Sequence, residues 1–431
     1  MKIVINPIRP ALSIASQDFH ILIRLQSEFK EEFKRTPINL VLVVDRSGSM
    51  EGAKLSEAKR CVIDLIKRMN PKDKVGVVQY DDQVDTVLPL SPVEQVSSIL
   101  EPLIQGITAN GSTSLHAGWL RGSEMLAPHA GRDATCHVIL ISDGLANHGL
   151  IDKARICEQV IALASAGVTT STVGLGADFN EELMTSMAHA GQGSAHYGER
   201  AVDLAETFDA EIGLLSHLQW RNVEISIPHS PNSLEILNSY QQTENGWRLP
   251  SIAMGSECWA LLRMSMQDAI RIQRMYGTAL EIKVNALDPS GNRFNFDFRM
   301  QNLPIVSETE YLSKQLHELV DRRINELTAA QLQLQIREAA LSSNWHHVEL
   351  LLTQLENLGR NEPWVAASIA FTRKLMRERD ERRMSKEMLY KSQKMRQRLS
   401  STDELMYSAQ ADLESPAFLR RKATEGRRTE T

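Results

Sequence analysis

Apolar residues recur along the chain in distinct patterns, and each pattern predicts a different kind of structure. Between residues 37 and 217, short continuous apolar runs alternate with segments in which apolar residues recur every three or four positions. Continuous runs are typical of strands buried on both faces, and the three-to-four spacing is typical of amphipathic helices. The predicted fold class is therefore α/β, with a doubly wound, mostly parallel sheet flanked by helices.

The alternating region is expected to form a domain of its own over residues 37–217. The helical spacing is clearest in its first helix, at Leu55, Ala58, Val62, Leu65 and Met69. The predicted strands are residues 38–45, 74–80, 136–142, 169–173 and 194–197. The predicted helices are residues 54–69, 93–103, 115–127, 152–166 and 180–190.

Strand patterns precede and follow this domain. Residues 1–36 hold short alternating runs that cannot form a domain alone, and residues 218–305 are rich in strand patterns. We expect the two segments to pair as a β-sandwich-like segment. The turn cluster Asp288–Asn292 also predicts a hairpin that runs from Leu280 to Met300.

Helical spacing returns over residues 306–399, which predict a C-terminal helical region. Two antiparallel helices broken near residues 342–344 would form a hairpin, and a third helix is predicted over residues 364–399. Residues 400–431 are polar and end in several arginines, so they are expected to be a disordered basic tail.

Composition narrows the class of protein. A chain of 431 residues is too long for one core and predicts two or three domains. The net charge of −6 argues against a dedicated nucleic-acid binder, and no apolar stretch is long enough to span a membrane. The four cysteines are widely spaced and predict free, largely buried thiols, as in a reducing compartment. A cytoplasmic protein is therefore expected.

The cations between Arg373 and Arg398 have two interpretations. They can form a solvated helix face with i,i+4 ion pairs, such as Glu378 with Arg382. They can also form a surface for an acidic partner or a nucleic acid. We favour the solvated face because no aromatic residues are regularly interleaved with the charges.

Oxygen-bearing side chains follow two of the buried strands. Asp45, Ser47 and Ser49 come after the first strand, Asp143 follows the strand at residues 136–142, and Thr113 lies at a loop-to-helix junction. Ligands of open α/β sheets bind outside the carboxyl ends of the strands, and hard oxygen donors suit Mg²⁺. Aspartate and serine at such positions also cap helices. Their coincidence at three places favours a metal site.

These five residues resemble the metal-ion-dependent adhesion site of von Willebrand factor A domains, with no departure at any position. Residues Val173–Asn180 and Gly191–Gly193 are similar to bacterial relatives of the A domains in calcium-activated chloride channels and inter-alpha-trypsin-inhibitor heavy chains. The resemblance implies that Asp45, Ser47, Ser49, Thr113 and Asp143 hold Mg²⁺, with Mn²⁺ or Ca²⁺ as alternatives.

The resemblance also implies a function, that of a metal-dependent protein-binding module or adaptor. One coordination position would be left for an Asp or Glu of a partner protein. By family analogy, the partner system would be a bacterial one that includes an AAA+ ATPase, a kinase or a phosphatase encoded elsewhere.

The alternative function is a Mg²⁺-dependent hydrolase or phosphatase-like enzyme that uses the same metal. Such an enzyme needs a base near the ion, and His116 and His148 are the candidates close in sequence. Asp81, Asp82 and Asp85 could form a second cation site, although a solvated acidic loop is the simpler interpretation.

Other enzyme motifs are incomplete. His317–Glu318 lacks the second histidine of a zinc-protease helix, and His346–His347 has no carboxylate at the required spacing. Gly174–Gly176 lacks the third glycine of a dinucleotide-binding turn. The chain also has no phosphate-binding P-loop and no nucleophile elbow. Catalysis by one of these motifs is therefore not expected.

Overall fold

The computed structural model describes residues 1–28, 35–131, 134–143, 146–175, 179–198, 208, 211–359 and 363–397. The chain divides into two compact units. One unit comprises Met1–Lys30, Trp220–Leu287 and Arg293–Thr431, and the other comprises Glu31–Gln219 and Asp288–Asn292. The basic tail predicted at residues 400–431 lies outside the described residues.

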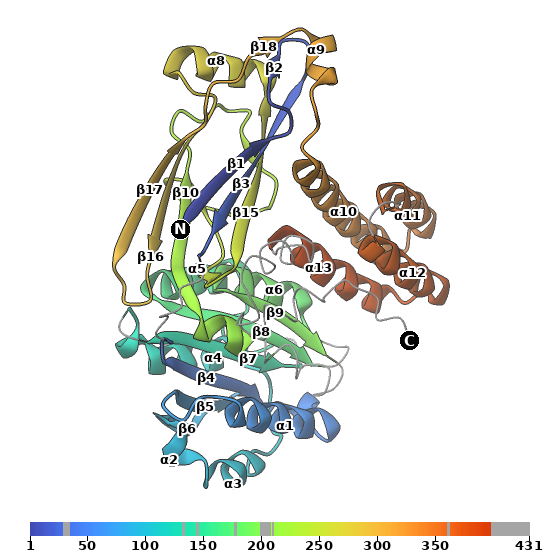
Figure 1. The fold of residues 1–431 in the computed structure, drawn as a ribbon. Coiled ribbons are helices and arrows are strands. Elements are labelled where there is room, and N and C mark those ends of the chain that lie inside the picture. The colour runs from blue at the N-terminus through green and yellow to red at the C-terminus, as the bar shows by residue number, and fades with distance from the viewer. Residues whose placement is uncertain are drawn as a thin grey trace. The chain divides into compact units, whose positions relative to one another are not determined.

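A six-stranded sheet forms the centre of the second unit, in the order β6-β5-β4-β7-β8-β9 (Figure 1). Its strands are β4 (Ile38–Asp45), β5 (Lys74–Tyr80), β6 (Val84–Pro92), β7 (Thr135–Ser142), β8 (Val168–Leu175) and β9 (Gln192–Gly198). All neighbouring pairs are parallel except β5 and β6. The mostly parallel sheet predicted from the apolar runs is confirmed.

Helices cover both faces of this sheet. They are α1 (Ala53–Lys67), α2 (Val93–Val96), α3 (Leu100–Gln105), α4 (Leu115–Leu126), α5 (Lys153–Ala166) and α6 (Glu181–Ala190), with short 3-10 turns at Gly48–Met50 and Ala127–His129. Alternate residues of β4 such as Leu42 share a core with α1, whereas Val43 faces α4. A Cβ atom at Gly122 would lie only 2.5 Å from Val43 Cγ2, so this glycine lets α4 pack closely against β4. Burial on both faces explains the continuous apolar run of β4.

Two details of this unit differ from the sequence expectation. The single helix predicted over residues 93–103 is wrong, because α2 ends at Val96 and α3 begins at Leu100. Pro102 has no N–H to continue an i→i−4 ladder, and the Ser97 hydroxyl donates to the Val93 carbonyl at 2.7 Å. Strand β6 was not predicted.

The other unit contains two antiparallel sheets whose facing side chains share one core. The first sheet has the order β1-β3-β15-β11, and the second has the order β12-β13-β10-β16-β17, with β14 paired to β10. The strands are β1 (Lys2–Pro7), β3 (Asp18–Gln26), β10 (Leu218–Ser226), β11 (Glu235–Ile236), β12 (Gln241–Gln242), β13 (Trp247–Arg248), β14 (Ile252–Ala253), β15 (Glu257–Ser265), β16 (Glu281–Leu287) and β17 (Arg293–Arg299). Strands β2 (Leu12–Ser13) and β18 (Ile305–Val306) form a separate parallel pair.

Long-range pairing joins the N-terminal strands to the later β-rich segment. Strand β3 pairs with β15 along its whole length, and β16 pairs with β17 as a hairpin. Met300 N–H donates to the Leu280 carbonyl at 2.9 Å, so the hairpin closes at the two residues expected from the sequence. Helix α8 (Met266–Tyr276) lies within this segment and was not predicted.

Helices follow from residue 308 onward: α9 (Glu308–Ser313), α10 (Glu318–Leu341), α11 (Trp345–Gly359), α12 (Pro363–Glu378) and α13 (Glu381–Gln397). The predicted break near residues 342–344 separates α10 from α11. The single helix predicted over residues 364–399 is wrong, because Arg379 adopts a left-handed conformation with φ 52°. Glu378 and Arg382 therefore lie on different helices and not on one helical face. In the described part of the chain, no helix is both long enough and apolar enough to cross a membrane.

Candidate metal centre

A continuous series of hydrogen bonds links four of the five predicted ligands at the carboxyl ends of β4 and β7. The Ser47 N–H donates to Asp45 Oδ1 at 2.8 Å, and the hydroxyls of Ser47 and Ser49 lie 3.1 Å apart. The Ser49 hydroxyl donates to Asp143 Oδ1 at 2.9 Å. The fold thus brings four oxygen-bearing side chains into one cluster, although they lie up to 98 positions apart in the sequence.

Thr113, the fifth predicted ligand, is placed by backbone contacts of its loop. Gly48 N–H donates to the Gly111 carbonyl at 3.1 Å, which ties this loop to the turn after β4. Thr113 N–H donates to Asn147 Oδ1 at 2.8 Å, and the N–H of Asn147 donates back to the Thr113 carbonyl. The Thr113 side chain is buried, so the loop holds its hydroxyl away from bulk solvent.

Asp45 lies at the end of β4 and is fully buried. Its Oδ1 accepts the Ser47 N–H, and its Oδ2 accepts the Ser142 hydroxyl at 2.6 Å. Burial raises the pKa of the Asp45 carboxyl, and the nearby Asp143 charge raises it further, while the hydrogen bonds of Ser142 and Ser47 oppose this shift. Among the described residues, no lysine or arginine pairs with Asp45.

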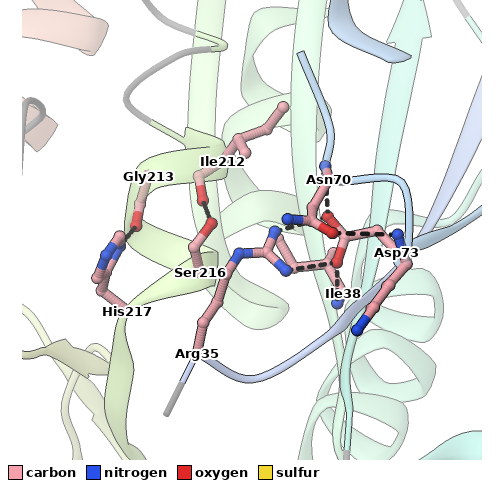
Figure 2. A network of polar contacts seen from close by, with 9 residues as sticks. Arg35, Ile38, Asn70, Asp73, Ile212, Gly213, Ser216 and His217 are labelled. Carbon is pink, nitrogen blue, oxygen red and sulfur yellow. Dashed lines mark hydrogen bonds and ion pairs between the residues drawn. The ribbon is translucent and has the colours of Figure 1, made fainter. Parts of the chain in front are cut away.

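A second buried aspartate shows how this fold neutralises a carboxylate with its own groups. Asp73, at the opposite end of the sheet, accepts two hydrogen bonds from the Arg35 guanidinium at 2.7 and 2.6 Å (Figure 2). The N–H groups of Ile38 and Asn70 donate to it as well, each at 3.0 Å. In the described part of the chain, Asp45 accepts from neutral groups of Ser47 and Ser142 and has no such cation, so its environment suits a bound positive ion.

Among the described residues, one cation contacts Asp143. The Lys54 ammonium donates to Asp143 Oδ2, while Asp143 Oδ1 accepts the Ser49 hydroxyl. Lys54 is the second residue of α1, and Gly52 just before this helix has φ 85°, a conformation that favours glycine. This turn brings the start of α1 back to the site. Sequence reasoning missed Lys54, Ser142 and Asn147.

The donor set fits a hard divalent cation. Two carboxylates and three hydroxyls supply oxygen atoms, the ligand type preferred by Mg²⁺, Mn²⁺ and Ca²⁺. Ser49 and Gly48 are exposed, so the cluster opens to solvent on one side. The described ranges contain no group of three or more His, Cys, Asp or Glu side chains arranged to hold a metal.

An arginine contacts two of the three aspartates in the acidic loop after β5. Arg46 Nη2 lies 3.2 Å from an Asp81 carboxylate oxygen and 3.3 Å from an Asp85 carboxylate oxygen. Gln83 N–H donates to the other Asp81 oxygen at 2.7 Å. Asp81 and Asp85 of the second cation site considered from the sequence therefore have an arginine of the protein itself as their cation.

The two histidines considered as catalytic bases have different surroundings. His116 Nε2 lies 2.9 Å from Gln159 Oε1, so its ring is bonded to α5. His148 is exposed, and its N–H donates to the Thr113 carbonyl at 3.2 Å, which places its backbone beside the cluster. Neither contact orients a base toward the oxygen cluster.

Comparisons with known proteins show what the chain is similar to. Residues 39–210 match the von Willebrand factor type A domain family. The protein sll0103 of Synechocystis is 25% identical over 293 residues, which are 64% of this chain and 68% of that protein. Inter-alpha-trypsin inhibitor heavy chain H1 of Mesocricetus auratus is 28% identical over 162 residues, 36% of this chain. The chain spans only 18% of that heavy chain.

Solved structures share the fold over most of the chain. A von Willebrand factor type A protein from Catenulispora acidiphila superposes with a TM-score of 0.68 at 16% identity, covering 87% of this chain and 89% of that one. The ArnB paralog VWA2 from Sulfolobus acidocaldarius superposes with a TM-score of 0.61 at 15% identity, covering 92% of this chain and 97% of that one. Residues 39–210 thus match the von Willebrand factor type A domain family, and the chain is similar to bacterial proteins with this domain and, over part of its length, to the inter-alpha-trypsin inhibitor heavy chains.

Proposed function

We propose that this chain is a divalent-cation-dependent protein-binding module or adaptor. In the proposal Asp45, Ser47, Ser49, Thr113 and Asp143 hold Mg²⁺, and the ion takes an Asp or Glu side chain of a partner protein. The partner system would be a bacterial multi-protein one. Von Willebrand factor A domains are typically metal-dependent adhesion or protein-binding modules, which supports this class of function.

One observation carries the proposal: the hydrogen-bonded oxygen cluster contains a fully buried carboxylate to which, among the residues that the structure describes, only neutral groups donate. Asp45 accepts from Ser47 N–H and from the Ser142 hydroxyl, and its pKa is raised mainly by burial. A divalent ion bound by this cluster would offset the cost of burying the carboxylate. The exposed edge at Gly48 and Ser49 leaves one side of such an ion accessible to a partner.

Catalysis by a metal-dependent hydrolase or phosphatase-like site is the less favoured function. A hydrolase needs a base or nucleophile held toward the metal, and the ring of His116 is bonded to Gln159 instead. The von Willebrand factor A family is usually non-catalytic. A phosphatase and ATPase assay on the purified chain, with a His148→Ala variant, distinguishes the two functions, because a binding module gives no turnover with either protein.

A pull-down from native lysate tests the proposal. Three proteins are tested, each in Mg²⁺ and in EDTA: the wild-type chain, Asp45→Ala, and Asp64→Ala. The last is a control that removes an exposed aspartate from α1. In Mg²⁺, we expect the wild type and the control to retain the same partners and Asp45→Ala to lose them. In EDTA, we expect all three proteins to lose these partners. Equal retention in all conditions would contradict a metal-dependent contact.

A further inference from the structure

Lys54 is a cation built into the edge of the oxygen cluster. Its ammonium contacts Asp143 Oδ2, the oxygen that Ser49 does not use. The Asp143 side chain is fully buried, whereas the Lys54 side chain is 34% exposed. The lysine therefore reaches inward from the surface, and its ammonium lies at the boundary between the cluster and solvent.

The position of Lys54 is fixed by the start of α1 and not by a flexible loop. Lys54 follows Ala53, the first residue of the helix, and the helix packs its Leu55 and Ala58 side chains into the core. The charge is thus held near the cluster whether or not the ammonium remains bonded to Asp143. Within the described residues, Lys54 is the one lysine or arginine that forms an ion pair with Asp45 or Asp143.

The charge of the site follows from these contacts. With Asp45 and Asp143 ionised, the two carboxylates and the Lys54 ammonium leave one net negative charge. A divalent ion would bring the cluster to one net positive charge, and an arriving carboxylate would then neutralise it. Without Lys54 the metal-loaded cluster would already be neutral, so a carboxylate would gain less electrostatic attraction.

We propose that Lys54 is a specificity-determining residue. It lowers the affinity of the site for its divalent ion and raises the affinity of the metal-loaded site for a partner carboxylate. The inference rests on the proposed function, since it presumes that the cluster binds a divalent ion. Two positive charges near the same carboxylates repel, which lowers metal affinity. The same ammonium attracts an anion that approaches the ion, which raises its affinity for carboxylates.

The test compares Lys54→Met, which removes the charge and keeps the length of the side chain, with Lys54→Arg, which keeps the charge. Lys59→Met is the matched control, because Lys59 lies on the same helix but bonds the Gln105 carbonyl. Isothermal titration calorimetry with Mn²⁺ measures metal affinity. Proton relaxation of acetate by the Mn²⁺-loaded proteins measures binding of a carboxylate that stands in for the partner side chain.

Lys54→Met is expected to bind Mn²⁺ about tenfold more tightly than wild type and to bind acetate severalfold more weakly. Lys54→Arg and Lys59→Met are expected to bind both ligands about as tightly as wild type. The Mn²⁺-induced rise in Tm would also be larger for Lys54→Met. Equal or weaker Mn²⁺ binding by Lys54→Met, or unchanged acetate binding, would overturn the inference. If the wild type itself binds no divalent ion, the proposed function fails, which is a distinct result.

Discussion

The Ser142 hydroxyl donates to Asp45 Oδ2 at 2.6 Å and so joins the last residue of β7 to the last residue of β4. The two strands are paired in parallel register, so their final residues are neighbours at the same edge of the sheet. Both side chains are fully buried. Ser142 therefore fixes the direction of the Asp45 carboxylate without being a predicted ligand itself.

Replacing Ser142 by alanine is expected to weaken Mg²⁺ binding by about 10- to 100-fold, as is usual when a group that orients a metal ligand is lost. Calorimetric titration measures this loss. Ser123→Ala is the matched control, because Ser123 is also a fully buried serine of this unit, but it donates to the Trp119 carbonyl in its own helix. Equal affinities for wild type and Ser142→Ala would show that the contact does not orient Asp45.

The Asp73 network predicts a stability effect far from the metal site. Asp73→Ala leaves the Arg35 guanidinium and the Ile38 and Asn70 N–H groups without their acceptor (Figure 2). The Asp73 side chain is fully buried and the Arg35 side chain is 30% exposed, so the loss is expected to cost about 3 kcal/mol of unfolding free energy, the lower end of the range for buried pairs. Urea denaturation measures the cost.

A surface ion pair provides the comparison for Asp73. Lys153 and Glu182 are about half exposed, so Glu182→Ala is expected to cost less than about 1 kcal/mol. If the two substitutions lower the unfolding free energy equally, the Asp73 network does not contribute as argued.

A buried His–Glu–His cluster predicts how stability depends on pH. Glu211 Oε1 accepts the Ser171 hydroxyl at 2.5 Å, and the Nε2 atoms of His137 and His196 each lie 3.3 Å from one Glu211 oxygen. Burial alone would raise the pKa of Glu211, but hydrogen bonds and charge from the two histidines hold it well below its usual value. A depressed carboxyl pKa stabilises the fold above the unfolded-state value of 4.5, and this contribution is lost as pH falls toward the folded-state value.

Glu211→Gln removes the charge and nearly preserves the size of the side chain. At pH 5, where a free imidazole is already protonated and a free glutamate is mostly ionised, we expect it to lower the unfolding free energy by about 1.5–3 kcal/mol, because hydrogen bonds to a charged acceptor are lost. At pH 4 the gap from wild type should shrink, since the wild-type carboxylate has begun to lose its advantage. Urea denaturation at both pH values checks the sign, and a gap that widens in acid would refute it.

The sheet and the proximity of Asp45 and Asp143 at one edge of it were predictable because both rest on a local pattern. Strands β4 and β7 are buried on both faces, so their sequences are continuous apolar runs. Asp45 and Asp143 follow those runs directly, and parallel strands present their carboxyl ends at one edge. Position along the strand was therefore enough to place the two carboxylates together.

Contacts between distant side chains could not be predicted in this way. Lys54 was seen only as part of a helix, and nothing in its spacing points to a partner 89 positions away. Ser142 was seen as the end of a strand, although its hydroxyl determines the direction of Asp45. Such contacts depend on side-chain conformations, which one sequence does not reveal.

Errors in the helices have specific physical causes. The break at Arg379 has neither glycine nor proline to mark it, and the helical spacing continues across it. Helix α8 had a detectable beginning, since the Ser265 side chain accepts the Asp268 N–H and the sequence Ser-x-x-Asp is typical of a helix start. The apolar residues of β15 just before it hid the change from strand to helix.

The most direct measurement is calorimetric titration of the purified, metal-free chain with Mg²⁺ and Mn²⁺, using wild type and Asp45→Ala. We predict that the wild type binds one divalent ion per chain and that Asp45→Ala binds it at least about 100-fold more weakly, with its fold retained by circular dichroism. Equal binding by the two proteins, or no binding by the folded wild type, would contradict a metal centre at the ends of β4 and β7.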